Sequence, residues 1–395
     1  MILPKPKRKA LIFRPINPTG PLVCSTKRLV EGLLLTGNWS VGWIWGPLPL
    51  TLLHPHGQHG IGICNYIKGG EYINPAFWHY VPLTYRPYIR GCPERWLFSA
   101  LEATSPSLTK KLKACGMYKV DLLLIESPTM VSALNICKAK LVVYHCTGAF
   151  HRFKSFPMPV LKAHSFLLHN VDLIVTVSHG IKKDLISNYS IPSEKVHVIE
   201  HGSVVSCDRH IPVFGQAKST LGKKPIAMLI GIPETTDIEL LQNLVNKAKN
   251  FHFIVIGPFG LRERCKFRKF PNIDFLGLLE HEKAMKILSQ GTVGLILYKK
   301  DAVERLAEGS KTMKIYDYAG AGLPIVSVPL PITDELLPIQ FARDPEEFVR
   351  ALEYCVEHKK ELQTKAIAFA RSNSWGKRQA EFIKLVEDML EAKEG

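Results

Sequence analysis

Two lysines and an aspartate in residues 308–328 are spaced so that they can bind an anion and a sugar. Lys311 and Lys314 stand three positions apart, with Asp317 three further on, in a segment that predicts a loop, a short helix and a buried strand. Residues at this spacing share a helix face, and the first turn of a helix carries partial positive charge. Such a face suits phosphate, and a carboxylate one turn on can accept hydrogen bonds from sugar hydroxyls. The segment therefore predicts a site for a diphosphate and a ribose.

A purely structural interpretation of the same segment stays open. Met313, Tyr316 and Ala319 have the helical spacing of an inward face, which would leave Lys314 and Asp317 as an exposed ion pair. In both interpretations Gly320 and Gly322 permit a left-handed helix end before the next strand.

Short apolar runs alternate with helical patterns along the chain, which is typical of α/β domains with parallel sheets. A first series predicts strands at 9–16, 41–45, 120–125, 140–144, 171–177 and 196–200, and a helix at 25–35 capped by Ser25 or Thr26. A second series predicts strands at 226–230, 251–256, 273–276 and 293–298, and helices from 345 onward. Residues 46–100 are rich in Pro, Gly, His and aromatic residues, and they give no clear pattern.

Two series of similar size predict an α/β fold with two Rossmann-like parallel-sheet domains facing across a cleft. We expect an N-terminal domain over residues 1–205 and a C-terminal domain over residues 206–372, joined near 205–225.

The positive charge is concentrated in the N-terminal half. The chain carries a net charge of +16, of which residues 1–205 contribute +13 and residues 206–395 contribute +3. A basic domain beside a near-neutral one indicates an anionic partner, and the candidates are a membrane surface, a phosphorylated lipid acceptor and nucleic acid. No recognisable nucleic-acid module accompanies the charge, so we expect no nucleic-acid partner. A basic surface without a partner is the alternative.

Composition also predicts a cellular location. The sequence contains no run of about 18 apolar residues, the length needed to span a membrane. The apolar stretch after the basic N-terminus is too short for a signal peptide. The nine cysteines are scattered, which fits reduced thiols in a cytoplasm and argues against disulfides or a zinc site. His54, His56 and His59 resemble a metal cluster, but no carboxylate or cysteine is nearby, so we expect no metal.

Four segments, in order and in register, resemble the two-domain glycosyltransferases called GT-B, in particular the family-4-like group. They are Val171–Leu185 with Ile191–Gly202, Phe251–Gly257 with Asn272–Gly277, Lys314–Pro324, and Ser374-Trp375. Together they cover most of residues 120–390. The match leans toward proteins resembling the bacterial glucuronosyltransferase of xanthan assembly, in which a Met-Lys pair precedes a Tyr-rich helix. The resemblance implies that a helical segment at 373–395 packs back on the N-terminal domain.

The resemblance implies that the C-terminal domain binds a nucleoside-diphosphate sugar, most simply a UDP sugar, without a metal cofactor. Lys314 would contact the diphosphate and Asp317 the ribose. Lys311 and Met313 belong to the same segment and complete the expected binding set. Gly231, after the first strand of that domain, would let the backbone approach the donor closely.

One departure concerns the catalytic base. Relatives commonly carry a phrase like Tyr-Asp-Cys-x-Asp in the N-terminal domain, but here His145 and Gly148 stand where acids are expected. An inverting transferase needs a base for the acceptor hydroxyl, and histidine can serve because its pKa is near neutral. The candidates, in order, are His145, His151 and Glu126. A retaining mechanism or an inactive chain would explain the missing acid equally well.

We therefore expect a glycosyltransferase that moves a sugar from a nucleotide sugar to a glycan or lipid-linked saccharide acceptor. It would be cytoplasmic and peripheral to the inner face of the membrane. A non-hydrolysing nucleotide-sugar epimerase and a catalytically inactive binding subunit of the same fold are the alternatives.

Overall fold

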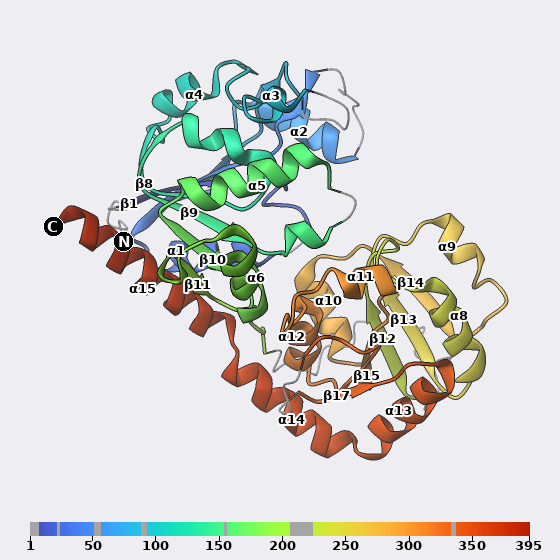
Figure 1. Cartoon of the computed structure of the whole chain (residues 1–395). Helices are drawn as coiled ribbons and strands as arrows, with labels where there is room; N and C mark the ends of the chain where they lie inside the picture. The colour runs from blue at the N-terminus through green and yellow to red at the C-terminus, as the bar shows by residue number, and fades with distance from the viewer. Residues whose placement is uncertain are drawn as a thin grey trace. The chain divides into compact units, whose positions relative to one another are not determined.

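The computed structural model describes residues 8–21, 24–50, 57–87, 93–153, 156–205, 224–332 and 337–395. These residues form two compact units (Figure 1). Unit 1 contains the described residues of 8–20, 24–200 and 379–395, and unit 2 contains Pro21 and the described residues of 201–378. The connection expected near 205–225 lies almost wholly outside the described residues.

Unit 1 is built on an eight-stranded sheet in the order β11-β10-β9-β8-β1-β2-β5-β4. Its strands are β1 (Arg8–Phe13), β2 (Trp39–Ile44), β4 (Glu71–Asn74), β5 (Phe77–Tyr80), β8 (Lys119–Ile125), β9 (Lys138–Cys146), β10 (Leu173–Thr176) and β11 (Val196–Val198). Only the edge pair β4–β5 is antiparallel within this sheet. Residues 10–13 of β1 are fully buried, as expected for a central strand covered on both faces.

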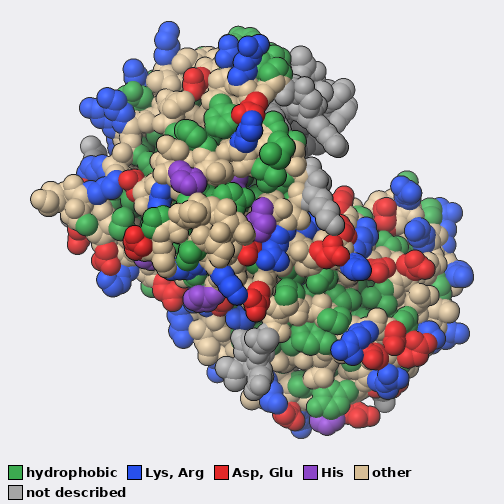
Figure 2. Space-filling model, viewed as in Figure 1, with side chains coloured by type: hydrophobic (Ala, Val, Ile, Leu, Met, Phe, Trp, Pro, Cys, Tyr) green, Lys and Arg blue, Asp and Glu red, His purple; other side chains and the backbone are tan. Residues whose placement is uncertain are grey.

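Helices and short strands complete unit 1. The helices are α1 (Ser25–Leu35), α2 (Gly57–Ile67), α3 (Glu94–Leu97), α4 (Leu108–Ala114), α5 (Met158–Asn170) and α6 (His179–Tyr189), with short 3-10 helices η2 (Pro128–Asn135), η3 (Phe150–Arg152) and η4 (Ser193–Lys195). A small sheet joins β3 (Leu48–Pro49), β6 (Leu83–Thr84) and β7 (Thr104–Ser105). Figure 2 shows Lys and Arg side chains around α4 on the viewed face of this unit.

The cap of α1 differs from the prediction. Neither Ser25 nor Thr26 is the N-cap, because Cys24 holds that position and its sulfur accepts a hydrogen bond from the Lys27 backbone N–H. The Thr26 hydroxyl is bound instead to the ring of a buried histidine, so it is not available to cap the helix.

The helix α15 (Trp375–Glu394) belongs to unit 1 from Gln379 onward. Phe382, Val386 and Leu390 recur every fourth residue on this helix and are fully buried. The Gln379 side-chain amide donates to the Arg28 carbonyl at 2.7 Å. An apolar stripe and a terminal hydrogen bond therefore attach this helix to unit 1.

Unit 2 has a six-stranded parallel sheet in the order β14-β13-β12-β15-β16-β17. Its strands are β12 (Ile226–Ile230), β13 (His252–Ile256), β14 (Ile273–Gly277), β15 (Val293–Ile296), β16 (Ile325–Ser327) and β17 (Ile339–Phe341). Counted in chain order, this is the 3-2-1-4-5-6 arrangement of the Rossmann fold. In unit 1, strands β5-β2-β1-β8-β9-β10 repeat it.

Helices cover both faces of the unit 2 sheet. They are α8 (Ile238–Lys247), α9 (Leu261–Cys265), α10 (His281–Leu288), α11 (Lys300–Glu304), α12 (Met313–Gly320), α13 (Pro345–Glu357) and α14 (Lys359–Ser372). Successive residues of β12 enter opposite cores: Leu229 packs with residues of α8 and α13, and Met228 packs with residues of α10, α12 and α14. Within the described ranges, each helix is too short or too polar to cross a bilayer.

Candidate functional site

The candidate site lies in unit 2, at the edge of the sheet where its parallel strands end. The strand order reverses between β12 and β15, because β13 and β14 lie on one side of β12 and the later strands on the other. In open α/β sheets, ligands bind outside the carboxyl ends of the strands at such a switch point. Gly231 directly follows β12, and Tyr298 comes shortly after β15.

Glycines at this edge allow the backbone segments after neighbouring strands to pack closely against one another. The Gly231 N–H donates to the Ile256 carbonyl at 3.0 Å, and the Gly257 N–H donates to the Gly277 carbonyl at 2.9 Å. Gly257 has φ of +147°, and a Cβ there would lie 1.8 Å from the Gly231 carbonyl oxygen. No other residue fits at this position without moving the loop after β12.

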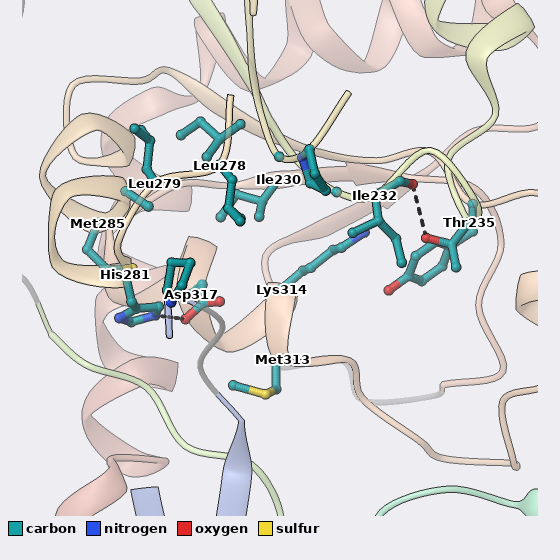
Figure 3. A pocket seen from close by; sticks show the side chains of 17 residues that line it. Ile230, Ile232, Thr235, Leu278, Leu279, His281, Met285, Met313, Lys314 and Asp317 are labelled. Atoms are coloured by element: carbon teal, nitrogen blue, oxygen red, sulfur yellow. Dashed lines mark hydrogen bonds and ion pairs between the residues drawn. The ribbon is translucent and has the colours of Figure 1, made fainter. Parts of the chain in front are cut away.

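A pocket of about 370 Å³ opens at this edge of the sheet (Figure 3), within the usual range for a small-molecule site. Its lining in unit 2 includes Ile230, Gly231, Ile232, Thr235, Ile256, Gly257, Pro258, Leu278, Leu279, His281, Ala284, Met285, Tyr298, Met313, Lys314 and Asp317. The predicted residues Gly231, Met313, Lys314 and Asp317 thus line one pocket. Lys311 is not among the lining residues. It also does not share a helix face with Lys314 as predicted, because α12 begins at Met313, after Lys311.

Lys314 places its ammonium group beside the end of β12. Its Nζ lies 4.3 Å from the centroid of the Tyr298 ring, and 3.6 Å from where a Cβ at Gly231 would be. The side chain points toward the Ile232–Thr235 loop (Figure 3). A cation over an aromatic face is held electrostatically, and it lies next to the N-terminal turn of α12, which adds partial positive charge.

Asp317 points away from Lys314 and contacts a histidine instead. His281 Nε2 lies 3.0 Å from Asp317 Oδ1, and the two side chains are 15% and 13% exposed. The structural alternative for this segment, an exposed Lys314–Asp317 ion pair, is therefore not formed. Tyr316 and Ala319 are buried as that alternative required, but Met313 lines the pocket.

The end of α12 follows the predicted glycine pattern in part. Gly322 has φ of +71°, the left-handed conformation expected after a helix. Gly320 remains helical, and a Cβ on it would lie 2.3 Å from the Val204 carbonyl oxygen. Gly320 is therefore needed for close backbone packing on this helix.

In unit 1, the predicted residue Glu126 occupies the equivalent switch point. Strands β1 and β8 are adjacent there, and the Glu126 N–H donates to the Phe13 carbonyl at 3.1 Å. The Glu126 carboxylate pairs with the Arg14 guanidinium, and both side chains are 10% exposed. Glu126 is thus held by a cation at the carboxyl ends of two central strands.

His145 lies near the end of β9 and is fully buried. Its Nδ1 lies 2.7 Å from the Thr26 hydroxyl, which ties β9 to the first turn of α1. A side chain with no exposed surface does not reach a substrate in this conformation.

His151 lies on η3 and is more accessible, with 28% of its side chain exposed. Its Nε2 is 3.5 Å from Asp184 Oδ2, on α6, and Arg152 donates to the two oxygens of that carboxylate at 3.0 and 3.1 Å. Burial lowers the pKa of His151, Asp184 opposes this shift, and Arg152 adds to it. The imidazole is therefore predominantly neutral near pH 7.

The histidine cluster that was considered as a metal site lies mostly outside the described residues. His54 and His56 lie outside the described residues, and so does the side chain of His59. Among the residues that the structure describes, no group of three His, Cys, Asp or Glu side chains could hold a metal ion. The expectation that no metal is needed stays a prediction.

Several residues of these sites were not predicted from the sequence. His281 and Tyr298 in unit 2, and Arg14 and Asp184 in unit 1, each contact a predicted residue that is distant in the chain. Their position in the sequence could have indicated three of them. His281, Tyr298 and Arg14 each follow the end of a parallel strand, where ligand-binding residues gather.

Two family models match separate parts of the chain. The model described as Glycosyltransferase Family 4 matches residues 69–204, and the model described as Glycosyl transferase-like matches residues 236–383. The first match contains β4 to β11, and the second contains β13 to β17 with α12.

The chain is also similar to a Bacillus subtilis (strain 168) protein provisionally named teichuronic acid biosynthesis glycosyltransferase TuaH. The identity is 21% over 213 residues, which are 49% of this chain and 52% of that protein. The chain thus spans about half the length of this curated relative.

Solved structures share the fold over nearly the whole chain. Sucrose-phosphate synthase from Thermosynechococcus elongatus has a TM-score of 0.69 at 13% identity, covering 98% of this chain and 100% of that chain. HepE from Anabaena in complex with UDP-glucose has a TM-score of 0.65 at 13% identity, covering 96% and 100%. A UDP-N-acetylglucosamine 2-epimerase has a TM-score of 0.56 at 13% identity, covering 95% of both chains. These likenesses confirm the predicted fold class, two α/β domains with parallel sheets.

Proposed function

We propose that this chain, a family-4-like GT-B glycosyltransferase, transfers a sugar from a UDP-linked nucleotide sugar to a glycan or lipid-linked saccharide. The observation that carries the donor assignment is the position of Lys314 and Asp317 in one pocket at the carboxyl edge of the unit 2 sheet. The complexes of HepE with UDP and with UDP-glucose support a uridine nucleotide on this fold. The Met313-Lys314 pair supports placement with the xanthan-type glucuronosyltransferases.

The donor would bind with its diphosphate near Lys314 and its ribose near Asp317. During transfer, the bond between the anomeric carbon and a diphosphate oxygen breaks, and negative charge grows on the leaving diphosphate. A fixed ammonium group beside the N-terminal turn of α12 stabilises that charge in the transition state. The absence of a Cβ at Gly231 leaves room for the diphosphate beside this ammonium.

The acceptor would bind to the N-terminal domain, with residues 206–372 forming the donor domain and 373–395 returning to the N-terminal one. We assign His151 as the base of an inverting displacement, ahead of His145 and Glu126. His145 is fully buried and Glu126 is held by Arg14, whereas His151 is 28% exposed. The acceptor oxygen would bond to the anomeric carbon while its proton passes to the His151 ring.

The donor assignment is tested by thermal unfolding in the presence of UDP, GDP and ADP. A nucleotide at 100 times its dissociation constant stabilises the folded state by about 2.7 kcal/mol. We expect UDP to give this shift with the wild type and Lys314→Ala to lose most of it, because the charge-assisted contact to the diphosphate is gone.

Lys247→Ala is the matched control, since this lysine of the same unit is 46% exposed and pairs with Glu346 on the surface. It should keep the full UDP shift. An equal shift in Lys314→Ala and Lys247→Ala would remove Lys314 from the donor site.

Nucleotide-sugar epimerisation is a second candidate, because an epimerase shares this fold. An epimerase would convert a UDP sugar without any acceptor, which NMR of the nucleotide sugar incubated with the protein alone detects. A catalytically inactive binding subunit would bind UDP yet release no UDP from a mixture of donor and acceptor.

A further inference from the structure

His281 is a partly buried polar residue of the candidate donor pocket that the sequence did not predict. It opens α10 and lies 36 positions before Asp317 in the chain, yet its Nε2 is 3.0 Å from Asp317 Oδ1. Figure 3 shows both side chains at the pocket wall, joined by this hydrogen bond. Both line the pocket.

We propose that His281 is a positioning residue that fixes the Asp317 carboxylate for the ribose hydroxyls and so determines selectivity for ribonucleotides over deoxyribonucleotides. This inference rests on the proposed donor function. The Nε2–H group donates to Oδ1, which sets the rotation of the carboxylate. Among the described residues, Asp317 Oδ2 has no hydrogen-bond partner, so this oxygen can accept from a hydroxyl group of a ligand.

The neighbouring lysine does not perform this task. Lys314 is three positions from Asp317 on α12, a spacing at which ion pairs form readily. Its Nζ lies instead over the Tyr298 ring at 4.3 Å. The pocket therefore separates a cation, suited to phosphate, from a carboxylate whose orientation depends on histidine.

The selectivity follows from the cost of an unmatched polar group. A partly buried carboxylate that is fixed toward a hydroxyl loses a hydrogen bond when a deoxy sugar replaces the ribose, and water does not fully restore it. A carboxylate that is free to rotate loses less, because it can turn to solvent. Removing His281 should therefore reduce discrimination more than it reduces binding of the diphosphate.

Unit 2 offers a matched control in a second histidine–aspartate pair. His252 Nε2 lies 2.8 Å from Asp274 Oδ2, where β13 and β14 begin, at the opposite edge of the same sheet. Removing His252 breaks the same kind of contact in the same unit, but away from the pocket.

The test is calorimetric titration of UDP, 2′-deoxy-UDP and 3′-deoxy-UDP into the wild type and into His281→Ala, His281→Gln and His252→Ala. We expect the wild type to bind UDP about tenfold or more tightly than at least one deoxy analogue. His281→Ala should bring that ratio to within about threefold, His281→Gln should restore most of it through its amide donor, and His252→Ala should leave it unchanged.

The outcomes separate this inference from the proposed function. If the wild type binds none of these nucleotides, both proposals fail. If the wild type binds UDP and His281→Ala keeps the wild-type ratio, only the role of His281 is overturned. If His281→Ala does not fold, His281→Gln decides. A wild-type ratio in His281→Gln supports positioning by a hydrogen-bond donor, and a lost ratio in a folded His281→Gln overturns it.

Discussion

The His151 imidazole has a lowered pKa, and this sets the pH range in which it can take a proton. Burial lowers the pKa from its ordinary value of 6.5, Asp184 raises it and Arg152 lowers it. Because the neutral ring is the base, a lower pKa keeps it active to lower pH. We expect the acidic limb of the kcat/KM profile to lie below pH 6.5. Replacing Asp184 by Asn should move this limb to still lower pH, since the carboxylate that favours the charged ring is removed.

Glu94→Gln is the control for this pH profile. Glu94 pairs with Lys162 at 2.8 Å on the surface of unit 1, with 41% of its side chain exposed. It should leave the acidic limb in place. An acidic limb that moves upward in Asp184→Asn would contradict the role given to His151.

At the residue scale, local spacing predicted part of the pocket and long-range pairing supplied the rest. Lys314 and Asp317 could be assigned to a ligand because three-residue spacing places both on one helical segment. His281 could not be assigned to Asp317, and Arg14 could not be assigned to Glu126. These partners are 36 and 112 positions apart. Such contacts depend on strand order, which periodicity does not determine.

Among the structural elements, the loops after β12 and β13 depend on one glycine. A Cβ at Gly257 would lie 1.8 Å from the Gly231 carbonyl oxygen, in a backbone conformation that only glycine adopts readily. Gly257→Ala should therefore displace the loop after β12, abolish the UDP-dependent thermal shift and lower the free energy of unfolding by about 1–3 kcal/mol.

Gly37→Ala is the control that separates the effect of backbone strain from the effect of the clash between an added Cβ and neighbouring atoms. Gly37 has φ of +71° but no atom within 4 Å of an added Cβ. It should cost about 1 kcal/mol of stability and leave nucleotide binding intact. Normal UDP binding by Gly257→Ala would show that the loop tolerates the change.

The buried strands were predictable and the irregular segment was not. Strands such as β8 and β12 are covered on both faces, so their sequences are nearly continuous apolar runs. Apart from α2 and β5, the described part of residues 46–100 holds the two-residue strands β3 and β6, the short helix α3 and the antiparallel edge strand β4. Elements this short contain too few residues for a period to appear. The sulfur cap at Cys24 was missed because cysteine is not among the usual capping residues.

On the scale of the whole molecule, part of the basic charge of unit 1 is concentrated at one edge of its sheet. A hollow at the amino-terminal edge of its sheet is lined by Lys9, Lys119, Lys138 and Lys140 together with Asp121. Lys140 is bound to Asp121 and to Glu394 at 2.9 and 2.6 Å. We propose that exposed lysines here support peripheral binding to an anionic membrane. The Lys119→Glu/Lys138→Glu variant should bind vesicles of phosphatidylcholine and phosphatidylglycerol at least about 30-fold more weakly, since each lysine contributes about 1 kcal/mol.

Unit 2 carries a comparable set of lysines for the control. Lys224, Lys249 and Lys269 line a hollow at the amino-terminal edge of the second sheet. If the basic half alone binds the membrane, Lys224→Glu/Lys249→Glu should bind the same vesicles as the wild type does. Equal losses in both double variants would indicate a response to net charge, and no loss in either would contradict membrane binding at this edge.

The arrangement of two similar sheets was predictable as a class, because two series of strands alternate with helices. The strand order in each sheet required the structure, since several orders satisfy the same alternation. The same holds for the attachment of α15. Its apolar stripe is visible in the sequence, but the stripe does not say which sheet it covers.

The attachment of α15 to unit 1 has a consequence for how the chain is made. Phe382, Val386 and Leu390 are fully buried in a unit whose sheet is complete by Val198, while residues 201–378 are synthesised in between. At ~5–20 residues per second, a ribosome needs roughly 10 to 35 s for that stretch. During this interval the apolar surface that later receives the helix is exposed on the nascent chain. Unit 2 can finish folding first, so the order of completion is the reverse of the order of synthesis.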